Sequence, residues 1–407
     1  MNTSFWDLLK DNTEGGVSFW CVDGIQKTDE DLSIVRLVHL NPIATRSPGL
    51  RYVTMDSELQ EQFRHGSCLS LKWSRLDKRN GFPVLTTEHV KRDEKLEFGL
   101  RKAISATLNE TNPLPEENGA HESYLPLGSS ESDLCNRERC SNCNGISEDM
   151  PAWARIHVHN VGQGDTIVLE LPGGQVWIID AMLWSKPRRD EFNAWMTKKG
   201  FHDKVKKVVI SHFHYDHIHS IPYVIETYNP QEVIISEALN HPTGAVQRVL
   251  DSSGGRLKKL GRKTAVYYFG NLKMRLIPSL ALYDKNVSLP LDPNYHGVGI
   301  LVETFSSFAF LGGDMPLEQC VKICSEFKSD TAVCYYYKVS HHGSRTACDD
   351  KFPSSLYPCY SVISCGYRNR YGHPHDPVLS ALRHGRCVKT YNISKGNTDS
   401  WTMFNTE

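Results

Sequence analysis

The segment His212-Phe213-His214-Tyr215-Asp216-His217 holds four side chains that can bind a metal ion. It directly follows the apolar run 208–210, which predicts the end of a strand. At about 3.3 Å per extended residue, three imidazoles and a carboxylate this close in sequence can converge on a tight turn. Two divalent ions about 4 Å apart can activate water and clamp both the attacking and the leaving oxygen of a hydrolysis. The segment therefore predicts a dinuclear metal site; the alternative is a His-rich surface loop that binds metal weakly.

Other candidate ligands share one feature, which is a position just after a predicted apolar strand. Catalytic side chains commonly lie on loops at one edge of a rigid scaffold, so we expect these residues to lie near the His-rich segment. An aspartate before a helix can also cap that helix, and this is the alternative for Asp314. The residues with this feature are Asp180, Asp314, His341, His342 and His373.

A glycine-rich turn, Val161-Gly162-Gln163-Gly164-Asp165, separates the predicted strands 155–161 and 166–171. Its two glycines permit a tight backbone turn. A carboxylate beside a metal-binding imidazole can accept the second ring N–H and fix the orientation of the ring. We assign this role to Asp165 and to Asp180, which ends the predicted strand 176–179.

The elements that position these residues occupy the second part of the 407-residue chain, which is longer than one typical domain. Residues 151–407 alternate predicted strands and helices and contain every candidate ligand named above. Residues 1–108 indicate a small N-terminal α+β module of unknown role, with a predicted helix over 92–108. Residues 109–150 are rich in Asn, Glu, Ser, Pro and Gly, which predicts a polar linker.

The predicted linker contains Cys135, Cys140 and Cys143, with a C-x4-C-x2-C spacing that suits a zinc knuckle. Structural zinc takes four ligands, so a fourth would have to come from His121, Cys68 or elsewhere. The alternative is three free cysteines in a flexible segment. Both interpretations stay open at this point.

Charge and hydropathy limit the classes of protein. The chain carries 46 Lys and Arg against 47 Asp and Glu, a net charge of −1, so a general coat of positive charge is excluded, although local basic patches such as 258–263 can persist. No apolar run reaches 18 residues and residues 1–30 lack a signal sequence, so we expect no membrane contact. Twelve cysteines without framework spacing favour a reducing compartment. These features predict a cytoplasmic protein.

Six ordered segments resemble the metallo-β-lactamase superfamily, and specifically its branch related to the hydrolase domain of the ComEC/Rec2 competence protein. The segments are HNVGQGDTIVLELPGG, WIIDA, SHFHYDHIHS, FLGGDM, KVSHHGSRT and YRNRYGHPHDPVLSALR, and the resemblance covers about residues 153–406. It implies an α/β (α+β) fold, an αββα sandwich with a dinuclear Zn²⁺ or Mn²⁺ site at one end of the two sheets. It also implies phosphodiester hydrolysis, with nucleic acid as the leading substrate.

The resemblance implies how the ligands divide between two ions. His212 and His214 would hold one ion, Asp216 and His217 would hold the other, and Asp314 would bridge them. Asp216 and Asp314 would also orient the attacking water, whose pKa two cations lower towards about 7.

Other residues would complete the site or face the substrate. One of His341 and His342 completes a metal site, and the other lies close to the substrate. Asn369 and His373 match the branch's Asn…Gly-His-Pro segment, where they would contact the substrate phosphate or protonate the leaving group.

The chain departs from the family pattern in three places. The superfamily has a further histidine ligand between the main motif and the bridging aspartate, where this chain offers His241 and His296 outside any motif. The two glycines usual after the main motif are replaced by His219 and Ser220, which would narrow the mouth of the site. The sequence contains no counterpart of the competence protein's membrane channel or nucleic-acid-binding barrel, so DNA uptake is not implied.

Three functions are compatible with these residues. The first is a metal-dependent nuclease acting on DNA. The second keeps the metal chemistry but cleaves a small phosphodiester, such as a cyclic nucleotide or a phosphorylcholine ester. The third is a subunit of a larger complex, whose N-terminal module binds another protein and whose metal site is regulatory. The motifs favour the first and leave open DNA against RNA, the metal, the oligomeric state and the pathway.

Overall fold

The computed structural model describes residues 17–27, 32–39, 50–64, 67–72, 78–79, 82–99, 123–125, 153–237, 243–284, 286–304, 307–327, 333–347, 356, 358, 360–366, 369–384, 389–392 and 398–404. The chain forms two compact units. The first comprises Met1–Thr111, Leu239–Gly254 and Pro290–Pro293, and the second comprises Asn112–Ala238, Gly255–Leu289 and Asn294–Glu407.

The first unit is built on a mixed sheet with strands in the order β5-β6-β3-β2-β1-β4-β7. Apolar residues at every second position, such as Val35 and Leu37 or Val53 and Met55, share one face and form its core. The predicted helix over 92–108 is helical over 94–99, and 100–108 lie outside the described residues. The bounds are β1 Val17–Lys27, β2 Leu32–His39, β3 Leu50–Asp56, α2 Ser57–Glu61, β4 Cys68–Lys72, β5 Lys78–Arg79, β6 Phe82–Leu85, β7 Val90–Arg92 and α7 Gly244–Ser253.

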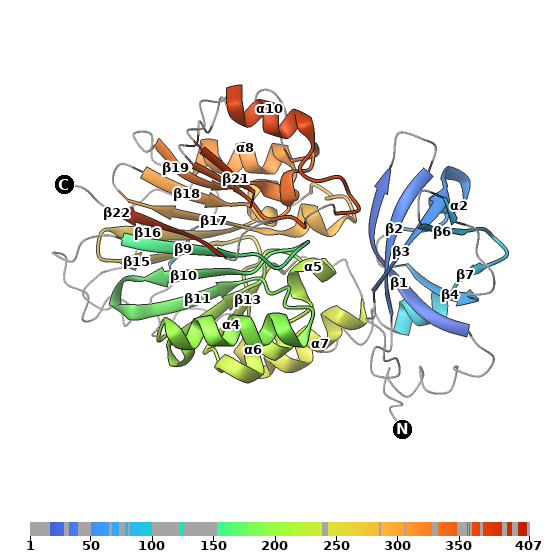
Figure 1. Ribbon diagram of the computed structural model, residues 1–407, viewed down its shortest axis with the longest axis horizontal. Helices are drawn as coiled ribbons and strands as arrows, with labels where there is room; N and C mark the ends of the chain where they lie inside the picture. The colour runs from blue at the N-terminus through green and yellow to red at the C-terminus, as the bar shows by residue number, and fades with distance from the viewer. Residues whose placement is uncertain are drawn as a thin grey trace. The chain divides into compact units, whose positions relative to one another are not determined.

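The second unit contains two sheets (Figure 1). The first sheet has the strand order β14-β13-β12-β11-β10-β9-β22. The bounds of its strands, in that order, are Leu257–Lys259, Glu232–Ile235, Val205–Val209, Gln175–Ile179, Ile167–Leu171, Trp153–His159 and Thr398–Phe404. The second sheet has the strand order β21-β20-β19-β18-β17-β16-β15-β8. The bounds of its strands, in that order, are Lys389–Asn392, Tyr360–Ile363, Val333–Lys338, Ser307–Leu311, Val298–Glu303, Leu272–Pro278, Thr264–Phe269 and Ser123–Leu125.

The main core of this unit lies between the two sheets. Trp177 of β11 meets Tyr267 of β15 edge to face, with ring centroids 4.8 Å apart. Helices cover the outer faces, α4 and α6 on the first sheet and α8 and α10 on the second (Figure 1). These layers confirm the predicted αββα sandwich. The helices are α4 Lys186–Lys198, α5 Tyr215–Ile218, α6 Ile221–Tyr228, α8 Leu317–Glu326 and α10 Asp376–His384.

Parallel strand pairs decide where the loops of the second unit meet. β11 pairs parallel with β12, and β18, β19 and β20 also pair parallel in that order. Because neighbouring parallel strands end at the same edge of a sheet, the loops that follow them lie together. These loops carry the candidate ligands.

Some strands were not predicted from the sequence. β8 lies inside the segment predicted as a linker and pairs with β15, and β22 pairs with β9 from Thr398 to Phe404. Such edge strands depend on pairing with a distant partner, which the local pattern of residues does not encode. Among the described residues, no helix has the length and apolar character needed to cross a membrane.

Candidate metal centre

The His-rich segment lies on the connection between β12 and α5, as predicted. The Ile210 N–H still donates to the Ile234 carbonyl at 2.9 Å, so the chain leaves the sheet just before Ser211. Helix α5 then places Asp216 and His217 in its first turn. Burial excludes the alternative of an exposed surface loop, because every one of the potential ligands is at most 5% exposed: His212, His214, Asp216 and His217.

One group of candidate ligands comprises His212, His214 and Asp314. His212 Nε2 lies 3.0 Å from His214 Nδ1 and 3.7 Å from Asp314 Oδ2. Asp314 follows β18 of the other sheet through a glycine turn. Gly313 has a φ of 55°, and a Cβ there would meet the Ser211 side chain at 2.8 Å. Glycine at this position therefore lets the two sheets bring their ligands together.

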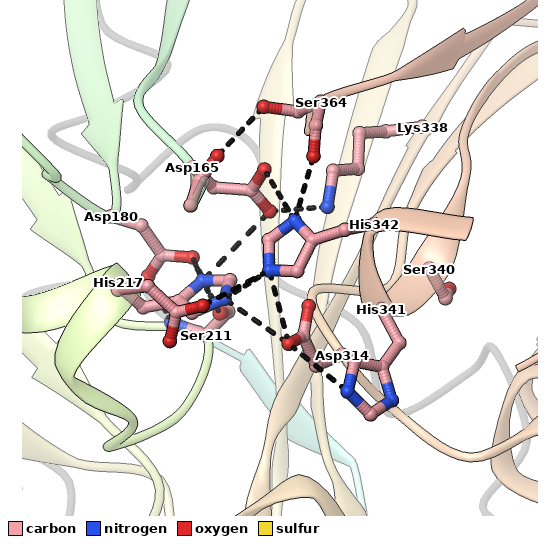
Figure 2. A network of polar contacts seen from close by, with 12 residues as sticks. Asp165, Asp180, Ser211, His217, Asp314, Lys338, Ser340, His341, His342 and Ser364 are labelled. Carbon is pink, nitrogen blue, oxygen red and sulfur yellow. Dashed lines mark hydrogen bonds and ion pairs between the residues drawn. The ribbon is translucent and has the colours of Figure 1, made fainter. Parts of the chain in front are cut away.

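A second group gathers around the same oxygen of Asp314 (Figure 2). His217 Nε2 and His342 Nε2 each lie 3.3 Å from Asp314 Oδ2 and 3.3 Å from each other. Asp216 Oδ2 lies 3.5 Å from His342 Nε2. Asp314 Oδ2 is thus close to both groups of donors, as expected of a carboxylate that bridges two cations.

Hydrogen bonds on the far side of the rings aim the Nε2 atoms of His217 and His342 at Asp314. His217 Nδ1 donates to Asp180 Oδ2 at 2.7 Å, and His342 Nδ1 donates to the Ser364 carbonyl at 2.8 Å. Asp180 is itself held by the backbone N–H and the hydroxyl of Ser211, at 2.7 and 2.5 Å. These bonds fix which ring nitrogen is left to bind a cation.

Asp165 lies behind the second group. It offers an oxygen within 4.8 Å of ligand atoms of His217, Asp314 and His342. Its oxygens nevertheless face the Nδ1 atoms, 3.7 Å from His342 Nδ1 and 3.8 Å from His217 Nδ1. Because the Nε2 atoms of both rings face Asp314, this position suits an acid that orients the rings better than a metal ligand. The buried Lys338 ammonium forms an ion pair with Asp165.

The paired histidines occupy different environments. His342 is 1% exposed and belongs to the second group, whereas the His341 side chain is 25% exposed and its Nε2 lies 3.9 Å from Asp314 Oδ2. The Thr346 hydroxyl lies 3.0 Å from His341 Nδ1. The structure therefore brings His342 into the centre and leaves His341 at its rim.

His373 and Asn369 lie on the loop after β20. The His373 ring centroid is 5.8 Å from that of His341, and neither ring nitrogen of His373 has a hydrogen-bond partner among the described residues. Burial lowers the pKa of His373 to about 2, so its ring is neutral at neutral pH. The Asn369 amide donates to the carbonyls of Gly366 and His373, and its oxygen accepts the N–H groups of Tyr371 and His373. Asn369 thus holds the loop that presents His373.

Burial and neighbouring charges shift pKa values in opposite directions within the centre. Burial alone would lower the pKa of His217, but Asp314 and Asp180 outweigh it and raise that pKa well above its usual value. Burial and the neighbouring His217 lower the pKa of His212 well below its usual value. Burial would raise the pKa of Asp314, but His342 and His217 outweigh it and lower that pKa. Asp314 is therefore kept ionised, as a cation ligand must be.

The donor set fits divalent cations. Its ligands are imidazole nitrogens and carboxylate oxygens, which suit Zn²⁺ and Mn²⁺. The ligand atoms of His212, His214 and Asp314 lie within 4.8 Å of one another, and so do those of His217, His342, Asp314 and Asp165. Asp314 Oδ1 is buried and has no hydrogen-bond partner among the described residues, which is costly for a carboxylate oxygen unless a cation contacts it. Two divalent ions would satisfy this arrangement.

Several predicted residues lie away from the centre or outside the described part of the chain. His296 is buried, and the His219 ring lies against Tyr215 with centroids 4.7 Å apart, but neither joins the ligand groups found among the described residues. The zinc-knuckle prediction and His241 fall outside the described residues, as do Cys135, Cys140 and Cys143.

Residues that the sequence analysis missed include Ser211, Ser364 and Lys338. Ser211 and Ser364 act through short hydrogen bonds that need the folded geometry. Lys338 carried a usable signal, because a lysine that ends an apolar strand just before the paired histidines is out of place in a buried core.

Part of the chain is similar to known proteins. Residues 159–303 match the family model of the Metallo-beta-lactamase superfamily. ComE operon protein 3 of Bacillus subtilis is 32% identical over 97 residues, which are 23% of this chain and 12% of that protein, so the match spans a small part of either. Igni18, a metallo hydrolase from Ignicoccus hospitalis, has 16% identity and a TM-score of 0.39, covering 61% of this chain and 98% of the other. The metallo-β-lactamase fold protein YhfI of Bacillus subtilis has 10% identity and a TM-score of 0.37, covering 60% and 99%. Given the family match and the buried cluster of His and Asp ligands, the chain contains a domain of the metallo-β-lactamase superfamily.

Proposed function

We propose that the second unit is a hydrolase that uses two divalent metal ions, Zn²⁺ or Mn²⁺, to cleave phosphodiester bonds, with DNA as its substrate. One observation carries this proposal. A single oxygen, Asp314 Oδ2, lies 3.7 Å from Nε2 of His212 in the first group and 3.3 Å from the Nε2 atoms of His217 and His342 in the second. Such sharing suits two cations about 4 Å apart, the spacing used in hydrolysis of phosphate esters.

The chemistry divides between the ions and the chain. Bound divalent cations would supply Lewis acidity, which activates water and neutralises the phosphate oxygens. The carboxylates of Asp216 and Asp314 would orient the attacking water. His341, whose side chain is 25% exposed at the rim, would give a proton to the leaving oxygen. The neutral His373 ring would hydrogen-bond the phosphate.

An exposed aromatic side chain on the segment between β11 and α4 supports a nucleic-acid substrate. Trp184 is 54% exposed and follows Leu183, whose N–H donates at 3.0 Å to the hydroxyl of Ser220, three residues after His217. An exposed indole beside cationic side chains can stack on a base and contact the phosphate backbone. The cationic residues in the first turn of α4 are Lys186, Arg188 and Arg189.

The test is hydrolysis by metal-stripped protein resupplied with Mn²⁺ or Zn²⁺, offered single-stranded DNA, double-stranded DNA, RNA and bis(p-nitrophenyl) phosphate. We expect metal-dependent cleavage of DNA that falls about 100-fold in Asp216→Asn. Asp203→Asn is the matched control, because the Asp203 side chain is 98% exposed on a 3-10 turn.

Full activity in Asp216→Asn would contradict the proposal. Cleavage of the small ester without cleavage of DNA would assign a small phosphodiester as the substrate class. Metal binding with no turnover of any substrate would favour a subunit whose metal site is regulatory.

A further inference from the structure

An ion pair inside the second unit has no role yet assigned in the proposed hydrolysis. Lys338 ends β19 of one sheet, and Asp165 follows β9 of the other sheet on the turn that leads into β10. Their side chains are 0% and 1% exposed, and Lys338 Nζ contacts Asp165 Oδ2 (Figure 2). Burying an ammonium is costly unless an acid pairs with it, so the contact is a specific feature of this fold.

Lys338 occupies a central position in its sheet. Its register partners are Leu311 of β18 and Val362 of β20. Leu311 leads through two glycines to Asp314, and Lys338 itself lies four residues before His342. The ammonium therefore reaches from the sheet that supplies Asp314 and His342 to a turn of the opposite sheet.

Asp165 contacts candidate ligands from both sheets. Its Oδ1 lies 3.7 Å from Nδ1 of His342, and its Oδ2 lies 3.8 Å from Nδ1 of His217. Its backbone N–H donates to the Asp216 carbonyl at 3.2 Å. Both Nδ1 protons are already donated, to the Ser364 carbonyl and to Asp180, so Asp165 acts on the two rings through its charge. That charge favours a proton on each Nδ1 and leaves each Nε2 free to face the cation.

The charge balance gives Lys338 a second effect. Four buried carboxylates, those of Asp165, Asp180, Asp216 and Asp314, carry −4 in total, and Lys338 offsets one of these charges. Two divalent ions would then leave the centre with a charge of +1 when its imidazoles are neutral. Without Lys338 the centre would be neutral and would attract an anionic substrate less.

We infer that Lys338 is a positioning residue of the metal centre, which acts through Asp165 to hold Nε2 of His217 and Nε2 of His342 at the spacing one cation needs. The inference rests on the proposed role of these residues as a metal centre. It does not depend on which substrate is cleaved.

The test compares metal binding by the whole chain and its Lys338→Met variant. The wild-type chain is expected to bind two Co²⁺ ions. Lys338→Met should bind the ion held by His217 and His342 about 10- to 100-fold more weakly, with a changed Co²⁺ absorption spectrum. The ion held by His212 and His214 should keep its affinity.

Lys207→Met is the matched control. Lys207 is also buried, at 7% exposure, and is paired with a carboxylate, that of Glu232, but it lies against Trp177 and Tyr267 in the core. Lys207→Met should lower the stability of the folded chain without changing the affinity of either metal site for Co²⁺. A third variant combines Lys338→Met with Asp165→Asn and so removes the carboxylate charge that Lys338→Met alone leaves unpaired. This variant should fold and should still bind the ion held by His217 and His342 weakly.

Wild-type affinity for both ions in folded Lys338→Met, or in the double variant, overturns the inference. If Lys338→Met binds only one of the two ions more weakly and the wild-type chain hydrolyses no substrate, the inference is supported and the proposed hydrolase function is contradicted. A wild-type chain that binds no Co²⁺ overturns both.

Discussion

The adjacent residues His341 and His342 illustrate how strongly a single position decides a role. Both have a positive φ, 48° and 53°. His342 Nδ1 donates to the Ser364 carbonyl, which leaves its Nε2 facing Asp314. His341 instead stays partly open to solvent at the rim. The two side chains are therefore expected to affect different steps.

Alanine substitutions separate these steps. His342→Ala should weaken binding of one metal ion by about 10-fold or more, because it removes a ligand nitrogen. His341→Ala should keep both ions and lower kcat about 100-fold, because it removes a proton donor. Metal titration and steady-state kinetics on the same preparations check both expectations. Metal loss in His341→Ala with retention in His342→Ala would reverse the assignment.

Helix α4 packs on β9 through aromatic and imidazole rings. The His157 and His159 centroids lie 5.0 and 4.4 Å from that of Trp195. Burial lowers the pKa of each histidine from 6.5 to about 3. Glu170 Oε2 lies 3.6 Å from His157 Nε2, but this carboxylate is paired with Arg155 at 2.7 Å. Burial is therefore the main cause of the lowered pKa of His157. Protonating either ring opposes the packing of this helix.

This packing should make stability depend on pH. The unfolded chain protonates His157 and His159 near pH 6.5, whereas the folded chain does so near pH 3. Their contribution is complete above about pH 6.5 and is lost as the pH falls towards 3, at up to about 1.4 kcal/mol per pH unit and histidine. Urea unfolding between about pH 7.5 and 5 should show a smaller loss of stability in His159→Phe than in wild type. Equal pH slopes would contradict this.

The segment between β11 and α4 presents Trp184 to solvent, next to Leu183, whose N–H donates to the hydroxyl of Ser220. Trp184→Ala should raise the KM for an oligonucleotide about 5- to 160-fold, because stacking of a base on an aromatic ring is worth about 1–3 kcal/mol. The KM for an abasic oligonucleotide of the same length should stay unchanged, since that substrate has no base to stack. Equal effects on the two substrates would exclude base stacking.

At the scale of the second unit, the candidate ligands come from both sheets. The His212–His217 segment follows β12 of one sheet, and Asp314 and His342 follow β18 and β19 of the other. A cation held by both sets therefore ties the two layers together. Cations that bind only the folded chain stabilise it by about 2.7 kcal/mol at a concentration 100-fold above Kd.

Thermal unfolding should show whether a cation bound by residues of both sheets stabilises the second unit. Adding Mn²⁺ to chelator-treated protein should raise the Tm by roughly 5–10 °C, and the rise should be much smaller in Asp314→Asn, which lacks the shared carboxylate. Differential scanning calorimetry makes the comparison. A wild-type Tm that does not respond to metal would argue against a centre shared between the sheets.

Much of the second unit could be predicted because its elements have strong local patterns. The strand predicted over 308–311 is Ser307–Leu311, and the strand predicted over 166–171 is Ile167–Leu171. The edge strand β22 has no such local signal, because it pairs with β9, which lies more than 200 residues earlier in the chain.

The sequence by itself determined the donor types and their places at strand ends, because ligand chemistry and strand periodicity are local properties. Only the tertiary structure placed His342 rather than His341 in the centre, turned Asp165 towards the Nδ1 edges, and buried Lys338 against it. Each of these features depends on distances between two sheets whose residues are far apart in the chain. No run of neighbouring residues contains that information.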